Sequence, residues 1–489
     1  GFFGLMPLEQ SILFEAGGRI SRGETPYKDF FFAYGLVPAY LQAVFFKILG
    51  TNWIVYVTHA ALLNAFFAVI VFNCLRIFLP DNQPGKSIVA SLLAAWAFYP
   101  MMGVPFMDNH SLFFSFAAWY VCVAAFEKKK FFLLFLVFPL MVLGFYSKPL
   151  PNVFWLFPIL AECWLWREDI KQWLRWMVYG TIAALVLLLL PALIFPRDPF
   201  LYYSFLLPLN LGQDRVIGDS SNNLPEKLRQ FKLILVCVVP LLFLLKNKGF
   251  FHLSANRKNL FRLAGIMIIT IFAGLLTLND FYNVTTPVFI IAFFIFDQLL
   301  KLKNTKNFIY RYVSLVLWIA LVLGVSYLNF TRKIHHIEFG KGDFSKYSRD
   351  LRLFLKTPRV NYSTDDIKRL KNYVSTGKSV YIGDMMFLYS LTAQKNPWPI
   401  THIHDGTTYN SKDSLHYNFL KRQMIRNIQQ SQANVVIRDS TWWTGESLVH
   451  FTEQFKGRKI DSFGIIRVYE IDSFKLYNVA RSLNINFEK

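Results

Sequence analysis

The chain has few charged residues and few cysteines for its length. Only 17% of its 489 residues are Asp, Glu, Lys or Arg, whereas 54% are hydrophobic and 51 are Phe. A soluble domain of this charge content would have too much apolar surface to bury. The four cysteines lie inside apolar segments without metal-like spacing, which argues against a disulfide framework or a zinc site. The sequence therefore indicates a polytopic membrane protein.

The chain also lacks the charge distribution of a nucleic-acid-binding protein, although its net charge is +21. Its Lys and Arg residues fall mostly in short loops between apolar runs and in the C-terminal third. The tendency of cytoplasmic loops to be basic accounts for the first group. We therefore expect no nucleic-acid partner.

Apolar runs long enough to cross a bilayer, about 17 to 25 residues each, recur through residues 53–330. We expect a transmembrane domain of about ten spans there, preceded by exterior juxtamembrane helices in residues 1–52. The opening GFFGLMP is typical of the end of a membrane helix, so we expect a further span before it. The expected spans are 53–78, 88–106, 109–126, 131–147, 149–166, 174–195, 231–246, 259–279, 283–300 and 310–329.

The loops between these runs alternate in charge, which predicts their sides. The loops at 128–130, 167–175, 246–262 and 301–311 are basic and are expected to be cytoplasmic. Counting spans back from Lys128 places the N-terminal segment outside. The apolar run 34–50 must then lie along the interface, because a full span there would invert every later loop.

Residues 7–30 form the most informative segment of the chain. Apolar residues recur at four-residue spacing, which predicts a helix lying at the water boundary with its charged residues facing away from the membrane. Gly23 and Pro26 are expected to end this helix. The apolar set is Leu8, Ile12, Ala16 and Ile20, and the charged set is Glu9, Glu15, Arg19 and Arg22.

A polar exterior domain is predicted at residues 331–489, where the long apolar runs stop. The segments 379–384, 434–439 and 464–471 read as short strands, and 413–432 has helical periodicity. This combination predicts a small α/β domain.

Three ionisable residues, Glu9, Asp108 and Lys148, stand at the outer ends of expected spans. Ionisable groups at membrane boundaries usually line a cavity or reach water, so their occurrence on one side suggests a site. His110 is expected to make a hydrogen bond near this site or to contact a sugar. Asp108-Asn109-His110 is a weak metal signal by itself, so we assign no metal ligand.

The segment PLEQSILFEAGGRISRGETPYKDF, followed by an interfacial helix ending in KILG, resembles the first exterior loop of GT-C superfamily glycosyltransferases. It is most similar to that of the bacterial protein O-mannosyltransferase and lipid A aminoarabinose transferase group. In that group an acidic residue opens a juxtamembrane helix, and a second acid begins a later span. Glu9 and Asp108 match these positions, and Lys148 resembles a basic residue of a later loop.

The resemblance implies an inner-membrane enzyme that moves a sugar from a polyprenyl-phosphate donor to a hydroxyl or amine of a lipid, glycan or protein at the exterior, periplasmic face. A fixed cation would stabilise charge on the leaving phosphate, with Lys148 as first candidate and Arg215 or Arg229 as others. Glu9 or Asp108 would act as general base, and inversion at the anomeric carbon is expected. No cofactor is certain, and the question of a divalent metal ion stays open.

Other aromatic residues suggest acceptor or sugar contacts. Tyr282 stands in a late exterior loop, and Trp442 with Trp443 resembles a sugar-stacking surface, although a buried pair or an exposed loop would explain the two tryptophans equally well. Two alternatives to a transferase remain. One is a multi-span transporter or flippase, and the other is a polymerase or ligase acting on polyprenyl-linked glycans.

Overall fold

The protein is described by a computed structural model covering residues 7–32, 35–78, 84–99, 103–207, 364–383, 385–401, 408–439 and 447–485, with isolated positions between 209 and 362 and at 403. The predicted spans at 231–246 and 283–300, and most of 259–279 and 310–329, lie outside these residues. So do the five candidate site residues Arg215, Arg229, Tyr282, Trp442 and Trp443.

Two helices form the N-terminal part, as predicted: α1 (Pro7–Ser21) and α2 (Leu36–Leu49). Gly17 lets them approach closely, because a Cβ there would stand 2.7 Å from Cγ of Gln42. Gly35 precedes α2 with a φ of 97°, a left-handed conformation that glycine adopts without steric cost. The two helices therefore pack closely where Gly17 meets Gln42.

The central part of the chain is a set of apolar helices. Within the residues that the structure describes, three segments are long and apolar enough to cross a membrane: Trp53–Phe78, Met107–Glu127 and Arg167–Ile194. The helices are α3 (Trp53–Phe78), α4 (Pro84–Phe98), α5 (Met107–Glu127), α6 (Val137–Ser147), α7 (Pro149–Asn152), α8 (Leu156–Leu165) and α9 (Ile170–Ile194), with 3-10 turns at Phe131–Leu136, Val153–Trp155 and Arg167–Asp169.

Two predicted spans differ from the helices observed. The run expected at 88–106 is helical only to Phe98, and 103–106 is not helical. The run expected at 149–166 is interrupted at Leu150, whose φ of −102° and ψ of 130° are not helical. Leu150 precedes Pro151, and proline disfavours the helical conformation of the residue before it.

A buried ion cluster joins the helices at the end of α5 away from Asp108. The Arg262 guanidinium contacts both carboxylate oxygens of Glu162, with Nε 2.8 Å from Oε2, and its Nη2 lies 2.7 Å from Oε1 of Glu127. Glu162 and Arg262 are both almost fully buried. The cluster fixes the ends of α5 and α8 to the chain near residue 262, since a buried charge requires partners.

The C-terminal part is a mixed sheet with helices, in the order β3-β4-β6-β5. The three predicted strands appear as β3 (Ser379–Ile382), β4 (Val435–Asp439) and β6 (Ile466–Ile471), and the predicted helix as α18 (Ser414–Ser431). β3 and β4 are parallel, whereas β6 is antiparallel to both β4 and β5. The other elements are β1 (Leu355–Lys356), β2 (Asn361–Tyr362), α16 (Thr364–Ser375), α17 (Phe387–Leu391), α19 (Ser447–Glu453), β5 (Lys456–Phe463) and α20 (Ser473–Ser482).

The sequence did not predict β5. This edge strand carries charged residues over most of its length, and only Phe463 is buried, so it lacks the apolar alternation of a half-buried strand. Charged side chains on an edge strand discourage pairing with another chain.

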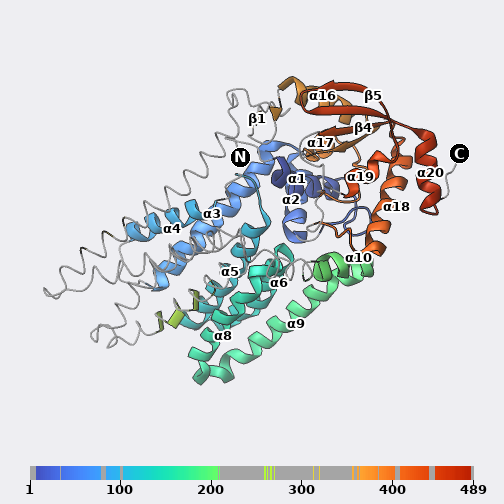
Figure 1. The fold of residues 1–489 in the computed structure, drawn as a ribbon. Helices are drawn as coiled ribbons and strands as arrows, with labels where there is room; N and C mark the ends of the chain where they lie inside the picture. Colours follow the sequence, from blue (N-terminus) through green and yellow to red (C-terminus); the bar gives the residue numbers. More distant parts are fainter. Residues whose placement is uncertain are drawn as a thin grey trace.

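The helices α1 and α2 lie between the apolar helices and the C-terminal domain (Figure 1). One hydrophobic core runs through all three parts, with Phe14 of α1 packed on Phe46 of α2, Tyr56 of α3 and Phe387 of α17. The backbone N–H of Phe31 donates to the carbonyl of Pro399 at 2.7 Å. The N-terminal helices are therefore part of the packing that joins the C-terminal domain to the membrane helices.

Candidate active site

Asp108 and Lys148, two of the three predicted ionisable site residues, form an ion pair. Asp108 lies in the first turn of α5, and Lys148 follows the last residue of α6. An acid at a helix N-terminus and a cation at a C-terminus are both favoured by the helix dipoles. The Asp108 side chain is 5% exposed and that of Lys148 is 25% exposed, so the carboxylate is more enclosed than its cationic partner.

The backbone around this pair is held in place by a chain of small polar residues. The Ser111 hydroxyl of α5 donates to the carbonyl of Lys148 at 2.9 Å. One helical turn later, Ser115 accepts a hydrogen bond of 2.6 Å from the Asn152 amide. A Cβ on Gly144 would stand 2.2 Å from that amide nitrogen, so only glycine fits there. The register between α5 and α6, and thus the Asp108–Lys148 pair, is fixed by these contacts.

The third predicted residue, Glu9, lies in α1, but its side chain is outside the described part of the structure. The structure therefore brings together Asp108 and Lys148 and gives no contact for Glu9. The assignment of Glu9 as the base remains a prediction, as do the roles of Arg215, Arg229, Tyr282, Trp442 and Trp443.

His110 is fully buried, with both ring nitrogens in hydrogen bonds. Nδ1 lies 2.7 Å from the carbonyl oxygen of Phe106, and Nε2 lies 3.0 Å from Nε2 of His59. These contacts fit the expected hydrogen-bonding role, and the expected sugar contact stays a prediction. His59 was not predicted, because an isolated histidine in an apolar helix carries no sequence signal of its partner.

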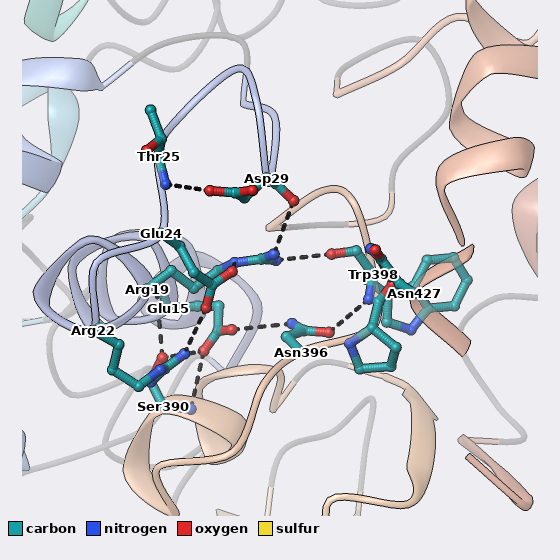
Figure 2. A network of polar contacts seen from close by, with 12 residues as sticks. Glu15, Arg19, Arg22, Glu24, Thr25, Asp29, Ser390, Asn396, Trp398 and Asn427 are labelled. Atoms are coloured by element: carbon teal, nitrogen blue, oxygen red, sulfur yellow. Dashed lines mark hydrogen bonds and ion pairs between the residues drawn. The ribbon is translucent and has the colours of Figure 1, made fainter. Parts of the chain in front are cut away.

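Two of the four charged residues predicted on the polar side of α1 do not face water, which corrects the prediction for them. Glu15 and Arg19 are both fully buried against the C-terminal domain (Figure 2). The Glu15 carboxylate accepts hydrogen bonds from the backbone and hydroxyl of Ser390 at 3.2 and 2.5 Å, and from the Asn396 amide at 3.1 Å. The polar face of α1 is thus covered by a domain that begins several hundred residues later in the chain.

Arg19 completes the same contact. Its guanidinium donates to the carbonyl of Trp398 at 2.8 Å, to the carboxylate of Glu24 at 2.7 Å and to the carbonyl of Asp29 at 3.2 Å (Figure 2). It also lies 4.5 Å from the ring centre of Phe30. Planar guanidinium groups suit such multiple fixed contacts, so Arg19 ties α1, the loop after it and the C-terminal domain together.

Burial raises the pKa of Glu15 above its ordinary value, while Arg22, Arg19 and the Ser390 hydroxyl lower it. The three donors around the carboxylate compensate for part of the cost of burying it.

A second contact joins the C-terminal domain to the segment that follows α9, formed by α10 (Arg197–Leu201) and a π-helical turn (Tyr202–Leu206). The His416 ring of α18 stacks on Tyr202 with ring centres 3.4 Å apart. Burial lowers the pKa of His416 to about 4, against a smaller opposing effect of Asp413.

This contact is expected to weaken in acid. A histidine whose pKa is lower in the folded protein binds fewer protons there than in the unfolded chain. Stability is therefore lost as the pH falls from about 6.5 towards 4. The variant His416→Phe keeps an aromatic ring but cannot take a proton, so its thermal unfolding temperature should fall less over this range. Parallel curves of unfolding temperature against pH for the two proteins would contradict this role. Glu15 is present in both proteins, so its titration does not account for a difference between them.

Among the described residues, no group of three or more His, Cys, Asp or Glu side chains could hold a metal ion.

No protein-family model matches the chain, and no curated protein sequence matches it. Its structure is similar to the crystal structure of ArnT from Cupriavidus metallidurans bound to undecaprenyl phosphate, with a TM-score of 0.51. The match covers 100% of this chain and 96% of the ArnT chain, and 10% of the aligned residues are identical. The two proteins therefore share a fold over essentially their whole length.

Proposed function

We propose that the protein is a membrane glycosyltransferase of the GT-C type, which transfers a sugar from a polyprenyl-phosphate donor to a hydroxyl or amine. The observation that carries the proposal is the Asp108–Lys148 pair, which places a buried carboxylate beside a partly exposed cation at the end of two apolar helices. The shared fold with ArnT, crystallised with undecaprenyl phosphate, supports a lipid-phosphate donor. The basic loops at the other ends of the apolar runs support placing the site on the exterior face.

Lys148 and Asp108 suit the two parts of the reaction, which are departure of the phosphate and attack by the acceptor. The bond between the anomeric carbon and the phosphate oxygen breaks, and a bond from the acceptor oxygen or nitrogen to that carbon forms. Lys148 would stabilise the negative charge that collects on the leaving polyprenyl phosphate. Asp108 would take the proton that the acceptor loses as it attacks.

We infer the order of these events from the ion pair. In a displacement with inversion, the leaving phosphate and the attacking group lie on opposite faces of the sugar. A phosphate that draws Lys148 towards itself would release a carboxylate oxygen of Asp108 to accept the proton. Donor binding would thus prepare the base, and the second acid Glu9 would assist in positioning the acceptor.

The experiment that tests this proposal removes the charge at Lys148. Lys148→Met is expected to lower kcat/KM for transfer from an undecaprenyl-phosphate sugar by about 100-fold to 1000-fold, as for other lost donors to a developing anion. Inhibition by undecaprenyl phosphate should weaken by about 10-fold to 100-fold, because a hydrogen bond to a charged group is lost. Steady-state assays in nanodiscs would measure both quantities.

Two control variants separate this effect from unfolding. Lys148→Arg keeps the charge and should retain more activity than Lys148→Met. The double variant Lys148→Met/Asp108→Asn removes both charges and should recover thermal stability without recovering activity. Unchanged inhibition by undecaprenyl phosphate in Lys148→Met would contradict the assignment of Lys148 as the phosphate ligand.

A further inference from the structure

His59 of α3 and His110 of α5 face each other inside the protein, and the reaction proposed above does not use them. Their Nε2 atoms are 3.0 Å apart, and both side chains are buried. The ring centres are 4.9 Å apart with planes crossing at 71°, so the rings meet at their edges rather than by stacking. A nitrogen–nitrogen contact of this length needs one proton between the two atoms.

The outer nitrogens of the pair have defined partners. Nδ1 of His110 lies 2.7 Å from the carbonyl oxygen of Phe106, which only accepts, so this nitrogen carries a proton. Nδ1 of His59 lies 2.9 Å from the side-chain amide of Gln42 on α2. The amide can present either its oxygen or its nitrogen to His59, because the two differ by a half turn of the amide group.

Counting protons then gives two self-consistent states. If the Gln42 nitrogen donates to His59, then His59 donates through Nε2 to His110, His110 donates to Phe106, and the pair is neutral. If the Gln42 oxygen accepts from His59, both Nδ1 atoms carry protons, and the contact between the Nε2 atoms requires one further proton. The pair then has a charge of +1.

The hydrogen bonds of the Gln42 amide favour neither of its two orientations. With its oxygen on His59, its buried amide nitrogen has no hydrogen-bond partner among the described residues. After a half turn of the amide, its oxygen takes the place of this nitrogen and is the atom without a partner. The two orientations therefore make the same number of hydrogen bonds. The amide is held in place by packing, since Gly17 of α1 lies directly against its side chain.

We propose that His59, His110 and Gln42 form a binding site for one proton, which is shared between the two Nε2 atoms and whose uptake is coupled to a half turn of the Gln42 amide. The site joins the juxtamembrane helix α2 to α5, two residues from Asp108. Its occupation places a positive charge in the first turn of α5, beside Asp108, the base of the proposed reaction.

Few charged or titratable side chains surround the His59–His110 pair among the described residues. From α2 it meets Gln42 and the ring of Phe45, which stacks on His59 with ring centres 4.8 Å apart. On α5 the nearest ionisable side chain along the chain is Asp108, which is paired with Lys148 of α6. From α1, Gly17 contacts Gln42. Asp108 already holds an ion pair with Lys148, so the two imidazoles are the groups to which the proposal assigns the proton.

The test is solid-state NMR of the full protein with ring-15N-labelled histidine in lipid bilayers, titrated from pH 8 to pH 4. At high pH we expect His59 protonated at Nε2 and His110 protonated at Nδ1, with a scalar coupling across the Nε2–Nε2 contact. Acidification should convert both residues together with uptake of one proton. Two histidines with the same tautomer, or two independent titrations, would overturn the proposal.

Substitution of Gln42 gives the sharper result. The carboxylate introduced by Gln42→Glu can only accept from His59 when it is ionised, so the shared proton should persist to a pH at least one unit higher, about a tenfold gain in proton affinity. Methionine in Gln42→Met can neither donate a hydrogen bond to His59 nor accept one as the amide does, so this variant should show no such gain in proton affinity. The variant His416→Phe is the control, because it removes an unrelated histidine. An unchanged midpoint in Gln42→Glu would contradict the coupling, as would a stoichiometric metal ion retained by the pair. These readouts need no transfer activity.

Discussion

Asp108→Asn is expected to reduce sugar transfer by about two to four orders of magnitude while leaving the protein folded. General bases contribute roughly this factor when they accept a proton in the transition state. Asparagine has nearly the size of aspartate and can still contact Lys148, but it cannot accept the proton of the acceptor. The Lys148 side chain is 25% exposed, so its loss of a carboxylate partner should cost little stability. The rate of transfer from a saturating donor, with the thermal unfolding temperature, measures both effects.

The matched control is Glu168→Gln, which makes the same kind of change at an exposed acid in the 3-10 turn before α9. It should retain full activity. The variant Glu9→Gln tests the other predicted acid, and its loss of activity together with full activity of Asp108→Asn would transfer the role of base to Glu9. Full activity in both variants would show that neither acid is the base.

Arg19→Met is expected to have the largest effect on stability. Removing one partner of a buried ionic network typically costs about 3 to 5 kcal/mol, because the remaining partners are left buried without a bond. Here the carbonyl of Trp398 and the carboxylate of Glu24 would lose their donor. Hydrogen exchange should rise in residues 11–21 and 386–398 as the C-terminal domain separates from α1.

Arg22→Met is the comparison for this experiment, since Arg22 follows α1, pairs with the same Glu24 and acts on Glu15 from the edge of the network. Its side chain is 23% exposed and its contact is 3.4 Å long, so its removal should cost less than about 1 kcal/mol. Equal losses for Arg19→Met and Arg22→Met would show that the buried network does not hold the two parts together.

The parts of the site that the sequence could predict are those marked by a break in apolar character. Asp108 and Lys148 were identifiable because each is a charge at the boundary of an apolar run, but their ion pair depends on how α5 and α6 pack and was not predicted. The amphipathic pattern of α1 also located that helix correctly. It could not reveal what covers the polar face, because the Glu15 and Ser390 contact joins residues 375 positions apart.

Other features depend on contacts that no local pattern contains. His59 and His110 lie 51 positions apart on two apolar helices, so neither marks the other in the sequence. The strand β5 has a mostly exposed edge position, which removed the alternation that would have predicted it. The break at Leu150 was readable from the following proline, but the length of the apolar run concealed it.

The most direct test of the proposed function is transfer from a panel of radiolabelled polyprenyl-phosphate sugars by the purified full-length protein, with a membrane extract as acceptor. We expect label from at least one donor to enter the acceptor with inverted anomeric configuration, and Asp108→Asn to abolish this incorporation. Folded protein that incorporates label from no donor, but moves labelled lipid across the bilayer of a vesicle, would contradict the account and indicate a transporter.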